Sequence, residues 1–204
     1  MNSHIDLING DCMEAMVKME DNQFDLAIVD PPYGIQKNMR GSRRMGKQMQ
    51  QKDWNHDIPP KEYFDQLYRV SKNQIIFGAN HYPQYMKPTR CWIVWDKKRS
   101  ELQSYSMHEL AATSFDRLPL VVYIHPEYKN RTHPCQKPVE LYTWILNKFT
   151  NEDDKILDTH LGSGSIAIAC HNLGFDLTAF EIDQEYFDAA QKRINQHKNQ
   201  LRIF

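Results

Sequence analysis

Short apolar runs alternate with amphipathic segments along the whole chain. The apolar runs are typical of buried strands and lie at 5–9, 25–29, 74–77, 91–95, 118–124, 155–157 and 177–180. Apolar residues at helical spacing predict helices at 11–19, 59–70, 139–149, 166–173 and 184–197. Strands that alternate with helices indicate a mostly parallel sheet with helices on both faces. We therefore expect a single α/β domain, with a Rossmann-like, doubly wound sheet of about seven strands.

Length and composition fit one globular domain. The chain has 204 residues, of which 41% are hydrophobic and 25% are charged. No apolar run reaches the roughly 20 residues that cross a bilayer, and the first residues lack the pattern of a secretion signal. Cys135 and Cys170, the closest pair of cysteines, lie 35 positions apart, so no Cys-x-x-Cys metal site is present. We expect a cytoplasmic protein with reduced thiols, no membrane segment and no metal.

Positive charge is concentrated in one segment. The formal net charge is −1, but residues 34–52 contain six basic residues and no acid. These basic residues are Lys37, Arg40, Arg43, Arg44, Lys47 and Lys52. Few apolar residues accompany them, so burial cannot offset the entropy of ordering, and we predict a mobile basic loop over 34–56. Clustered Lys and Arg favour contact with nucleic-acid phosphates, while a solvated loop without a partner fits the same composition.

A glycine turn follows the buried run at 155–157. The chain there reads Asp158-Thr159-His160-Leu161-Gly162-Ser163-Gly164-Ser165 and continues into a predicted helix. In α/β folds, a strand, a glycine turn and a helix bring backbone N–H groups close to a ligand. Glu181 ends the next strand, 19 positions after Gly162, which is the spacing of a carboxylate that accepts from ribose hydroxyls. The sequence predicts a nucleoside-type ligand here, although many such turns bind nothing.

A second motif follows the buried run at 25–29 and reads Asp30-Pro31-Pro32-Tyr33. The two prolines stiffen the backbone and remove two N–H donors. The Asp30 carboxylate and the Asp30 and Pro31 carbonyls remain as acceptors, and Tyr33 offers a flat aromatic face. Acceptors beside an aromatic ring suit a flat base that carries an amino group. A proline turn with a helix-capping aspartate is the alternative interpretation.

With these motifs identified, the chain resembles the S-adenosylmethionine-dependent amino-methyltransferases that act on nucleic-acid bases. Residues 30–33 resemble their catalytic motif, 158–165 their cofactor motif, and 132–138 the segment that precedes the cofactor motif in one subgroup. This order resembles the circularly permuted β group of DNA adenine-N6 and cytosine-N4 methyltransferases. The resemblance implies a circularly permuted class I methyltransferase fold, a small inserted target-recognition region over 96–131, and methylation of adenine N6 in DNA by base flipping.

The resemblance also implies roles for individual residues. Asp30, Pro31, Pro32 and Tyr33 are expected to hold the target base. The residues expected to bind S-adenosyl-L-methionine are Asp11, Asp30, Lys137, Asp158, His160, Leu161, Gly162, Ser163, Gly164, Ser165 and Glu181. Among them, Asp11 would accept from the cofactor's adenine, Glu181 from its ribose, and Lys137 would lie at its carboxylate. The family's usual Asp-Pro-Phe is Asp158-Thr159-His160 here, and a packing role is expected for His160 rather than a role as base.

Contacts to DNA are expected from the basic residues Lys37, Arg40, Arg43, Arg44 and Lys47, and from Asn80, Lys97 and Lys98 beyond two strands. A homodimer would compensate for a small target-recognition region. Several alternatives stay open at this point. Cytosine N4 is a possible target, although that subgroup more often has Ser in place of Asp30. A catalytically silent nucleic-acid-binding subunit, a protein or small-molecule amine as substrate, and attack on cytosine C5 by Cys135 are further alternatives.

Overall fold

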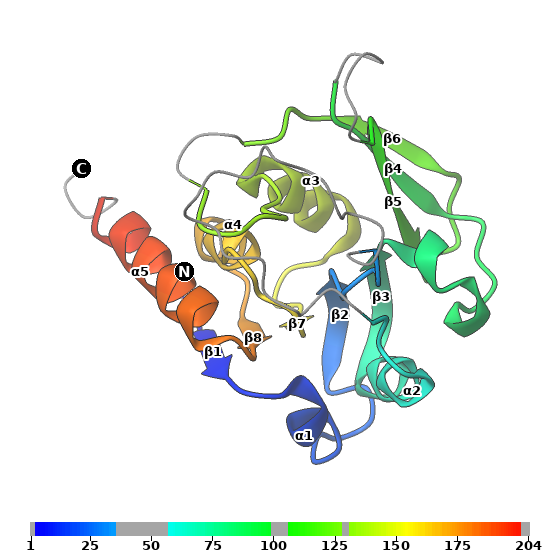
Figure 1. The fold of residues 1–204 in the computed structure, drawn as a ribbon, viewed down its shortest axis with the longest axis horizontal. Coiled ribbons are helices and arrows are strands. Elements are labelled where there is room, and N and C mark those ends of the chain that lie inside the picture. The colour runs from blue at the N-terminus through cyan, green and yellow to red at the C-terminus, as the bar shows by residue number, and fades with distance from the viewer. Residues whose placement is uncertain (1–2, 36–56, 99–105, 128–130, 201–204) are drawn as a thin grey trace.

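The computed structural model describes residues 3–35, 57–98, 106–127 and 131–200. These residues form one eight-stranded sheet with the strand order β1-β8-β7-β2-β3-β5-β4-β6 (Figure 1). The strands are β1 (Ile5–Asn9), β2 (Phe24–Val29), β3 (Ser71–Phe77), β4 (Trp92–Asp96), β5 (His108–Thr113), β6 (Leu120–Tyr123), β7 (Ile156–Asp158) and β8 (Leu177–Glu181). The α-helices are α1 (Cys12–Met16), α2 (Lys61–Val70), α3 (Val139–Phe149), α4 (Ser165–Leu173) and α5 (Gln184–Gln200).

The direction of the strands decides which residues meet at one edge of the sheet. Neighbouring strands from β1 through β8, β7 and β2 to β3 are parallel. β5 runs antiparallel to both β3 and β4, and β4 is parallel to β6. The carboxyl ends of the parallel strands and of β4 therefore share one edge with the first residues of β5. Ligands in open α/β sheets bind outside this edge.

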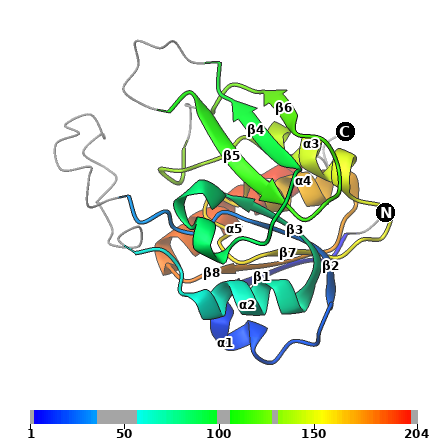
Figure 2. The same ribbon diagram turned by 90° about the vertical axis from the view of Figure 1, so that its right-hand side faces the viewer.

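Helices cover both faces of the sheet. In Figure 2, α1 and α2 lie below the sheet and α3 and α4 lie above it. The buried residues accordingly form two clusters, one with Leu141, Ile168 and Ile194 of α3, α4 and α5, and one with Met16 and Phe64 of α1 and α2. Successive residues of a buried strand such as β2 contribute to the two clusters in turn, as strand geometry requires. The expected α/β fold with both faces covered is confirmed.

Proline and glycine set the ends of three helices. Pro60 and Pro138, with φ near −69° and −64°, precede α2 and α3, and such a fixed φ suits the start of a helix. Gly164 and Gly174, which bracket α4, have φ of 74° and 85°. Glycine adopts this left-handed conformation without the clash of a Cβ. The ends of α4, which follows the glycine turn, are thus encoded locally.

β5 was not among the strands predicted from the sequence. Residues 108–113 contain adjacent alanines and two charged or polar residues at the start, and they lack the β-branched run that predicts a strand. Both β5 and β6 fall within 96–131, the stretch expected to form a small inserted target-recognition region. Both strands pair within the main sheet, and a role of this stretch in target recognition stays a prediction. The predicted helix at 11–19 is also shorter, since α1 ends at Met16.

Among the described residues, no helix has the length and apolar character needed to span a membrane. The same part of the chain contains no cluster of His, Cys, Asp or Glu side chains arranged to hold a metal ion.

Candidate active site

The two motifs found in the sequence meet at the same edge of the sheet. Asp30 directly follows β2, and Asp158 is the last residue of the adjacent strand β7. Glu181 ends β8, which lies on the other side of β7. Gly78 follows β3, next to β2. Because these strands are parallel, their ends converge, and residues far apart in the chain form one site.

The glycine turn is fixed against the end of β8. The Gly162 N–H donates to Glu181 Oε2 over 2.9 Å, and the Leu161 N–H donates to the Phe180 carbonyl over 2.8 Å. Gly162 has a φ of 52°, which favours glycine. A Cβ at Gly164 would lie 3.1 Å from the side chain of Ile194, so the turn also packs closely on α5. The structure brings Glu181 to the glycine turn, as its spacing in the sequence predicts.

The end of β1 completes this part of the site. The Gly10 N–H donates to the Glu181 carbonyl oxygen over 3.0 Å, so the β1 and β8 ends lie side by side. A Cβ at Gly10 would meet no atom within 4 Å, which marks open space beside the backbone. The exposed Asp11 follows and caps α1, its Oδ1 accepting from the Met13 N–H over 2.8 Å. Asp11 and Glu181 thus lie at the adjacent ends of β1 and β8.

Asp158 is a buried acid whose pKa is raised. Its side chain is 2% exposed and accepts from the His160 N–H over 2.9 Å. Burial raises the pKa of Asp158 to about 8, and the nearby carboxylates of Asp30 and Glu181 act in the same direction. Burial likewise raises the pKa of Glu181 above its ordinary value. The site at the glycine turn therefore holds acids that a positively charged ligand would favour in their ionised form.

His160 is part of the packing beneath the turn. Its Nδ1 lies 2.9 Å from the Thr159 hydroxyl, which in turn lies 2.6 Å from the Tyr63 hydroxyl of α2. The His160 ring meets the Tyr63 ring edge to face at 5.4 Å. Burial lowers the pKa of His160 to about 4, so the ring is neutral at pH 7. Where the family usually has Pro-Phe, this chain thus has a hydrogen-bonded and packed group.

The second motif is held by a cluster of charges that the sequence did not reveal. Tyr33 donates its hydroxyl hydrogen toward Asp30 Oδ1 at 2.5 Å and Glu109 Oε1 at 2.8 Å. The Lys137 ammonium lies 2.5 Å from Asp30 Oδ2 and 2.6 Å from Glu109 Oε1. Lys97 contacts the other oxygen of Glu109 at 2.9 Å. We call Asp30, Glu109, Lys97 and Lys137 the charge quartet; its carboxylates and ammonium groups balance.

Two sequence-based expectations change here. Lys137 was expected at the carboxylate end of the cofactor, but its ammonium is bound to Asp30 and Glu109, and the side chain is only 3% exposed. Lys97 was expected to contact phosphate, but it pairs with Glu109 and is 14% exposed. Both lysines turn inward because two partly buried carboxylates need counter-charges, and local sequence does not show where these carboxylates lie.

The quartet sets the ionisation of its acids. Burial raises the pKa of Asp30, and Lys137 opposes this shift. Burial acts against the Glu109 carboxylate too, but Lys137 and Lys97 together lower the pKa of Glu109 to about 2. Glu109 ends lower than Asp30 because it contacts two lysines and Asp30 contacts one. The pKa of Lys137 is raised by both carboxylates, so the ammonium stays charged.

The ring of Tyr33 packs against Gly78, which follows β3. Gly78 has a φ of 66°, and a Cβ there would lie 2.1 Å from Tyr33 Cε1. His81 stacks on Tyr33 with ring centroids 4.9 Å apart and an angle of 11° between the planes. The sequence did not single out Gly78 or His81 for this role; the only signal was a glycine directly after a strand. The Tyr33 ring is thus oriented by a close backbone approach and an aromatic neighbour.

Hydrogen bonds and an ion pair of Glu127 and Arg193 connect the 131–139 segment to the glycine turn. Glu127 accepts from Gln136 Nε2 at 2.8 Å and from the Val139 N–H at 3.3 Å. Arg193 of α5 contacts the same carboxylate at 3.3 Å and donates to the Ser163 carbonyl oxygen at 2.9 Å. The residues on either side of Lys137 are therefore tied to the expected cofactor turn through α5.

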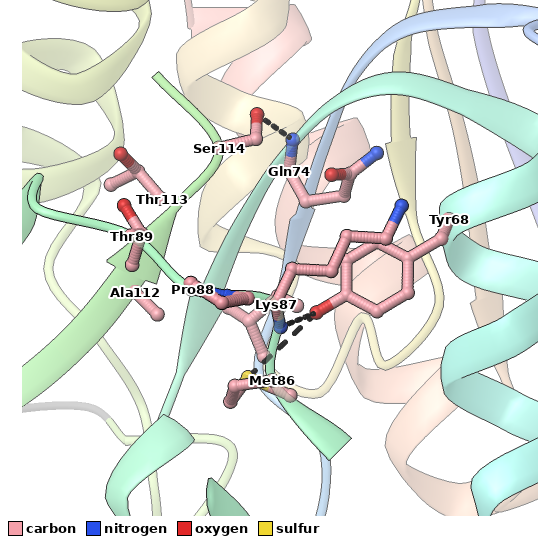
Figure 3. A pocket seen from close by; sticks show the side chains of 10 residues that line it. Tyr68, Gln74, Met86, Lys87, Pro88, Thr89, Ala112, Thr113 and Ser114 are labelled. Atoms are coloured by element: carbon pink, nitrogen blue, oxygen red, sulfur yellow. Dashed lines mark hydrogen bonds between the residues drawn. The ribbon is translucent and has the colours of Figure 1, made fainter. Parts of the chain in front are cut away.

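The expected DNA contacts are described only in part. Asn80 lies in an exposed short helical turn after β3, and Lys98 is exposed beyond β4. Lys37, Arg40, Arg43, Arg44 and Lys47 lie outside the described residues, as does most of the predicted basic loop. A pocket next to Tyr68 of α2 lies elsewhere, against the middle of β3 and the end of β5, and none of the predicted site residues lines it (Figure 3). The chemistry concentrates at the other edge.

Comparison with known proteins identifies the family of the chain. Residues 78–192, more than half of the chain, match the model of the N6/N4 methyltransferase family, described as a DNA methylase. The type II methyltransferase M.HpaI of Haemophilus parainfluenzae is 25% identical over 95% of this chain and 75% of its own length. The DNA adenine methyltransferase YhdJ of Escherichia coli is 24% identical over 93% of this chain and 82% of its own length.

Solved structures share the fold. The M1.HpyAVI–SAM complex superimposes with a TM-score of 0.62 at 20% identity, covering 94% of this chain and 99% of that one. The cytosine-N4-specific PvuII DNA methyltransferase gives a TM-score of 0.66 at 11% identity, covering 98% and 93%. One of the two was thus solved with the cofactor that the sequence predicts. Cys135 as a nucleophile for cytosine C5 finds no support in these matches. The chain belongs to the N6/N4 DNA methylase family.

Proposed function

We propose that this protein transfers a methyl group from S-adenosyl-L-methionine to the N6 amino group of adenine in DNA. The observation that carries the proposal is the meeting of Asp30 and Tyr33 with the turn of Gly162 and Glu181 at one edge of the sheet. One half of this site suits a flat base with an amino group, and the other half suits a nucleoside. The order of the motifs along the chain supports the circularly permuted topology of the β group.

The residues at the glycine turn fit the proposed cofactor. Asp11 and Glu181 lie at the adjacent ends of β1 and β8, and their carboxylates would accept from the adenine amino group and the ribose hydroxyls. The remaining cofactor contacts are assigned to Asp158 and to residues 160–165. The ionised form of buried Asp158 would be favoured by a cationic neighbour. S-Adenosylmethionine, when bound, supplies a methyl group on a positively charged sulfur.

The chain's own residues would activate and orient the target amine. The lone pair of an exocyclic amine is delocalised into the ring, so the amine is a weak nucleophile. Acceptance of its N–H groups by the Asp30 carboxylate and the Pro31 carbonyl would favour a tetrahedral nitrogen and stabilise the positive charge that grows on it. Alignment of the amine supplies a further part of the acceleration. The proposed base site offers carboxylate and carbonyl oxygens for these bonds and few competing donors, because Pro31 and Pro32 lack N–H groups.

The target base has to leave the duplex to reach this pocket. Extrusion of a base costs a few kcal/mol, and stacking on an aromatic ring returns about 1–3 kcal/mol. Tyr33 is the ring proposed for this stacking. We assign the phosphate contacts to the basic loop predicted over 34–56 and to Lys98, and a contact close to the base to Asn80. The remainder of 96–131 and a second copy of the chain are proposed to complete target recognition.

Adenine is favoured over cytosine because the motif begins with Asp30, where the cytosine-N4 subgroup more often has Ser. Cytosine N4 stays the second candidate, since the PvuII enzyme of similar fold is cytosine-N4-specific. A silent nucleic-acid-binding subunit would have no use for a partly buried carboxylate held by Tyr33 and Lys137. An intact Asp30 therefore argues for catalysis.

The test is methyl transfer from labelled S-adenosylmethionine to DNA, followed by hydrolysis of the DNA to nucleosides. Label in N6-methyldeoxyadenosine supports the proposal; label in N4-methyldeoxycytidine selects the second candidate, and no label supports the silent subunit. Asp30→Asn is expected to abolish transfer with cofactor affinity retained. Asp25→Asn is the matched control, since Asp25 pairs with Lys72 at 2.6 Å at the opposite end of the same strand.

A further inference from the structure

We infer that Glu109 is a positioning residue for methyl transfer, which holds the Tyr33 hydroxyl and the Lys137 ammonium around Asp30. The inference rests on the proposed function and deepens it, because nothing in the motifs points to Glu109. It reaches the site from β5, the strand that the sequence did not predict.

Glu109 contacts both of the groups that touch Asp30. Its Oε1 accepts from the Tyr33 hydroxyl at 2.8 Å and lies 2.6 Å from the Lys137 ammonium. The same two groups lie 2.5 Å from the two oxygens of Asp30. Tyr33 and Lys137 therefore sit between two carboxylates. Of these two carboxylates, removal of Glu109 would leave only Asp30 in contact with the Tyr33 hydroxyl and the Lys137 ammonium.

The balance of charge explains why a second acid is needed. Lys137 is only 3% exposed, so water cannot screen its charge. With Asp30 as its sole partner, Lys137 would pair with Asp30 fully and compete with the amino group of the base for the same oxygens. Because the Lys137 ammonium is shared between Glu109 and Asp30, it binds Asp30 less strongly, and Asp30 is a stronger acceptor for the amino group of the base. Lys97, in turn, keeps Glu109 ionised through its contact at 2.9 Å.

The backbone around Glu109 is fixed from both sides. The Gly78 N–H donates to the Leu110 carbonyl at 2.8 Å, and the Lys97 N–H donates to the Met107 carbonyl at 2.9 Å. Glu109 also pairs with Trp95 in the register of β4 and β5. Its carboxylate thus approaches Asp30 from a sheet strand, and residues on rigid elements hold catalytic geometry better than residues on loops.

A purely structural ion pair is the competing explanation, and the pH dependence of the reaction separates the two. Protonation of Asp30 would remove its ability to accept from the base and so produce the acidic limb of kcat/KM. Loss of the nearby negative charge of Glu109 lowers the pKa of Asp30, whereas loss of Lys137 raises it. The titratable groups outside the charge quartet that interact with its carboxylates include Tyr33, Tyr82, His81, Cys135, Tyr142 and Asp158. The variants below leave them and Lys97 in place.

The experiment measures kcat, both KM values and the pH profile of kcat/KM for Glu109→Gln and Lys137→Met, with Asp25→Asn as control. We expect Glu109→Gln to lower kcat about 10- to 100-fold, with the KM for S-adenosylmethionine unchanged and the acidic limb moved to lower pH. Lys137→Met is expected to move the limb to higher pH. Glu109→Asp keeps the charge and is expected to keep the wild-type limb, so it also serves if Glu109→Gln does not fold.

Opposite shifts of the limb in Glu109→Gln and Lys137→Met support the inference. An unchanged kcat in Glu109→Gln, or a lower kcat with the wild-type pH profile, overturns it and assigns Glu109 to stability alone. If Glu109→Gln does not fold, a limb in Glu109→Asp that differs from the wild type overturns it as well. Wild-type protein that methylates no DNA would instead reject the proposed function, so the two failures are distinguishable.

Discussion

Tyr33 packs so closely on Gly78 that a Cβ at position 78 would lie 2.1 Å from Tyr33 Cε1. The ring cannot yield freely, because its hydroxyl is bonded to Asp30 and Glu109 and its ring is stacked on His81. A glycine outside the recognised motifs therefore decides where the aromatic ring of the proposed catalytic motif lies.

Gly78→Ala is expected to displace Tyr33 and to place a side chain at a φ of 66°. Strain and overpacking of this kind cost about 1–3 kcal/mol of stability, and methyl transfer should fall more than stability explains. Urea denaturation and methylation rates measure the two effects. Gly10→Ala, whose Cβ would meet no atom within 4 Å, is the control for stability. Equal rates for wild type and Gly78→Ala would show that the ring position is not critical.

Tyr33→Phe separates the ring from the hydroxyl. The ring still stacks on an extruded base, but the hydrogen bonds to Asp30 and Glu109 are lost. We expect kcat to fall about tenfold, in the range of a lost orienting contact, with little change in DNA affinity. Fluorescence of 2-aminopurine at the target position should still report extrusion. Tyr33→Ala is expected to lose the extrusion signal too; retention of that signal would exclude Tyr33 as the stacking partner.

Glu181→Ala is expected to weaken S-adenosylmethionine binding about 10- to 100-fold, because the ribose hydroxyls lose an acceptor and the Gly162 and Asp183 N–H groups lose theirs. Isothermal titration calorimetry measures the dissociation constant. Glu152→Ala changes an exposed acid outside the site and is the matched control. A dissociation constant equal to that of wild type would place the ribose elsewhere.

Asp158 makes stability depend on pH. Its pKa rises from the ordinary 3.8 to about 8 on folding, so between these values the folded state binds more protons than the unfolded state. Stability should fall as pH rises from about 4 to about 8, by at most about 1.4 kcal/mol per pH unit, and level off above. In Asp158→Asn this contribution disappears. Thermal unfolding of both proteins without cofactor at pH 5 and pH 8 tests this; identical pH dependence would contradict it.

The parts of the site that follow strand ends could be predicted from the sequence. Asp30 and Glu181 each end or follow a short apolar run, and parallel strands bring such positions together. Glu109 could not be found in this way, because it lies near the start of an antiparallel strand whose sequence looks unlike a strand. Its position at the active edge depends on the pairing of β5 with β3 and β4, which is a property of the whole sheet.

Lys97 and Lys137 show a second limit. Lysine is almost always exposed, so local reasoning assigns it to solvent or to a ligand. Here both side chains are drawn inward by acids that are distant in the chain. The partner of a buried charge is thus a tertiary fact, whereas the existence of the glycine turn and the Asp-Pro-Pro-Tyr corner is a local one.

The neutrality of the charge quartet constrains how this enzyme can diverge. Replacement of one member leaves an opposite charge without its partner in a place with little water. Single changes at Glu109 or Lys97 are therefore disfavoured, whereas loss of both keeps the net charge of the quartet at zero. In related proteins, Glu109 and Lys97 should therefore be kept together or lost together. Where both are lost, Asp30 and Lys137 would remain as a neutral ion pair.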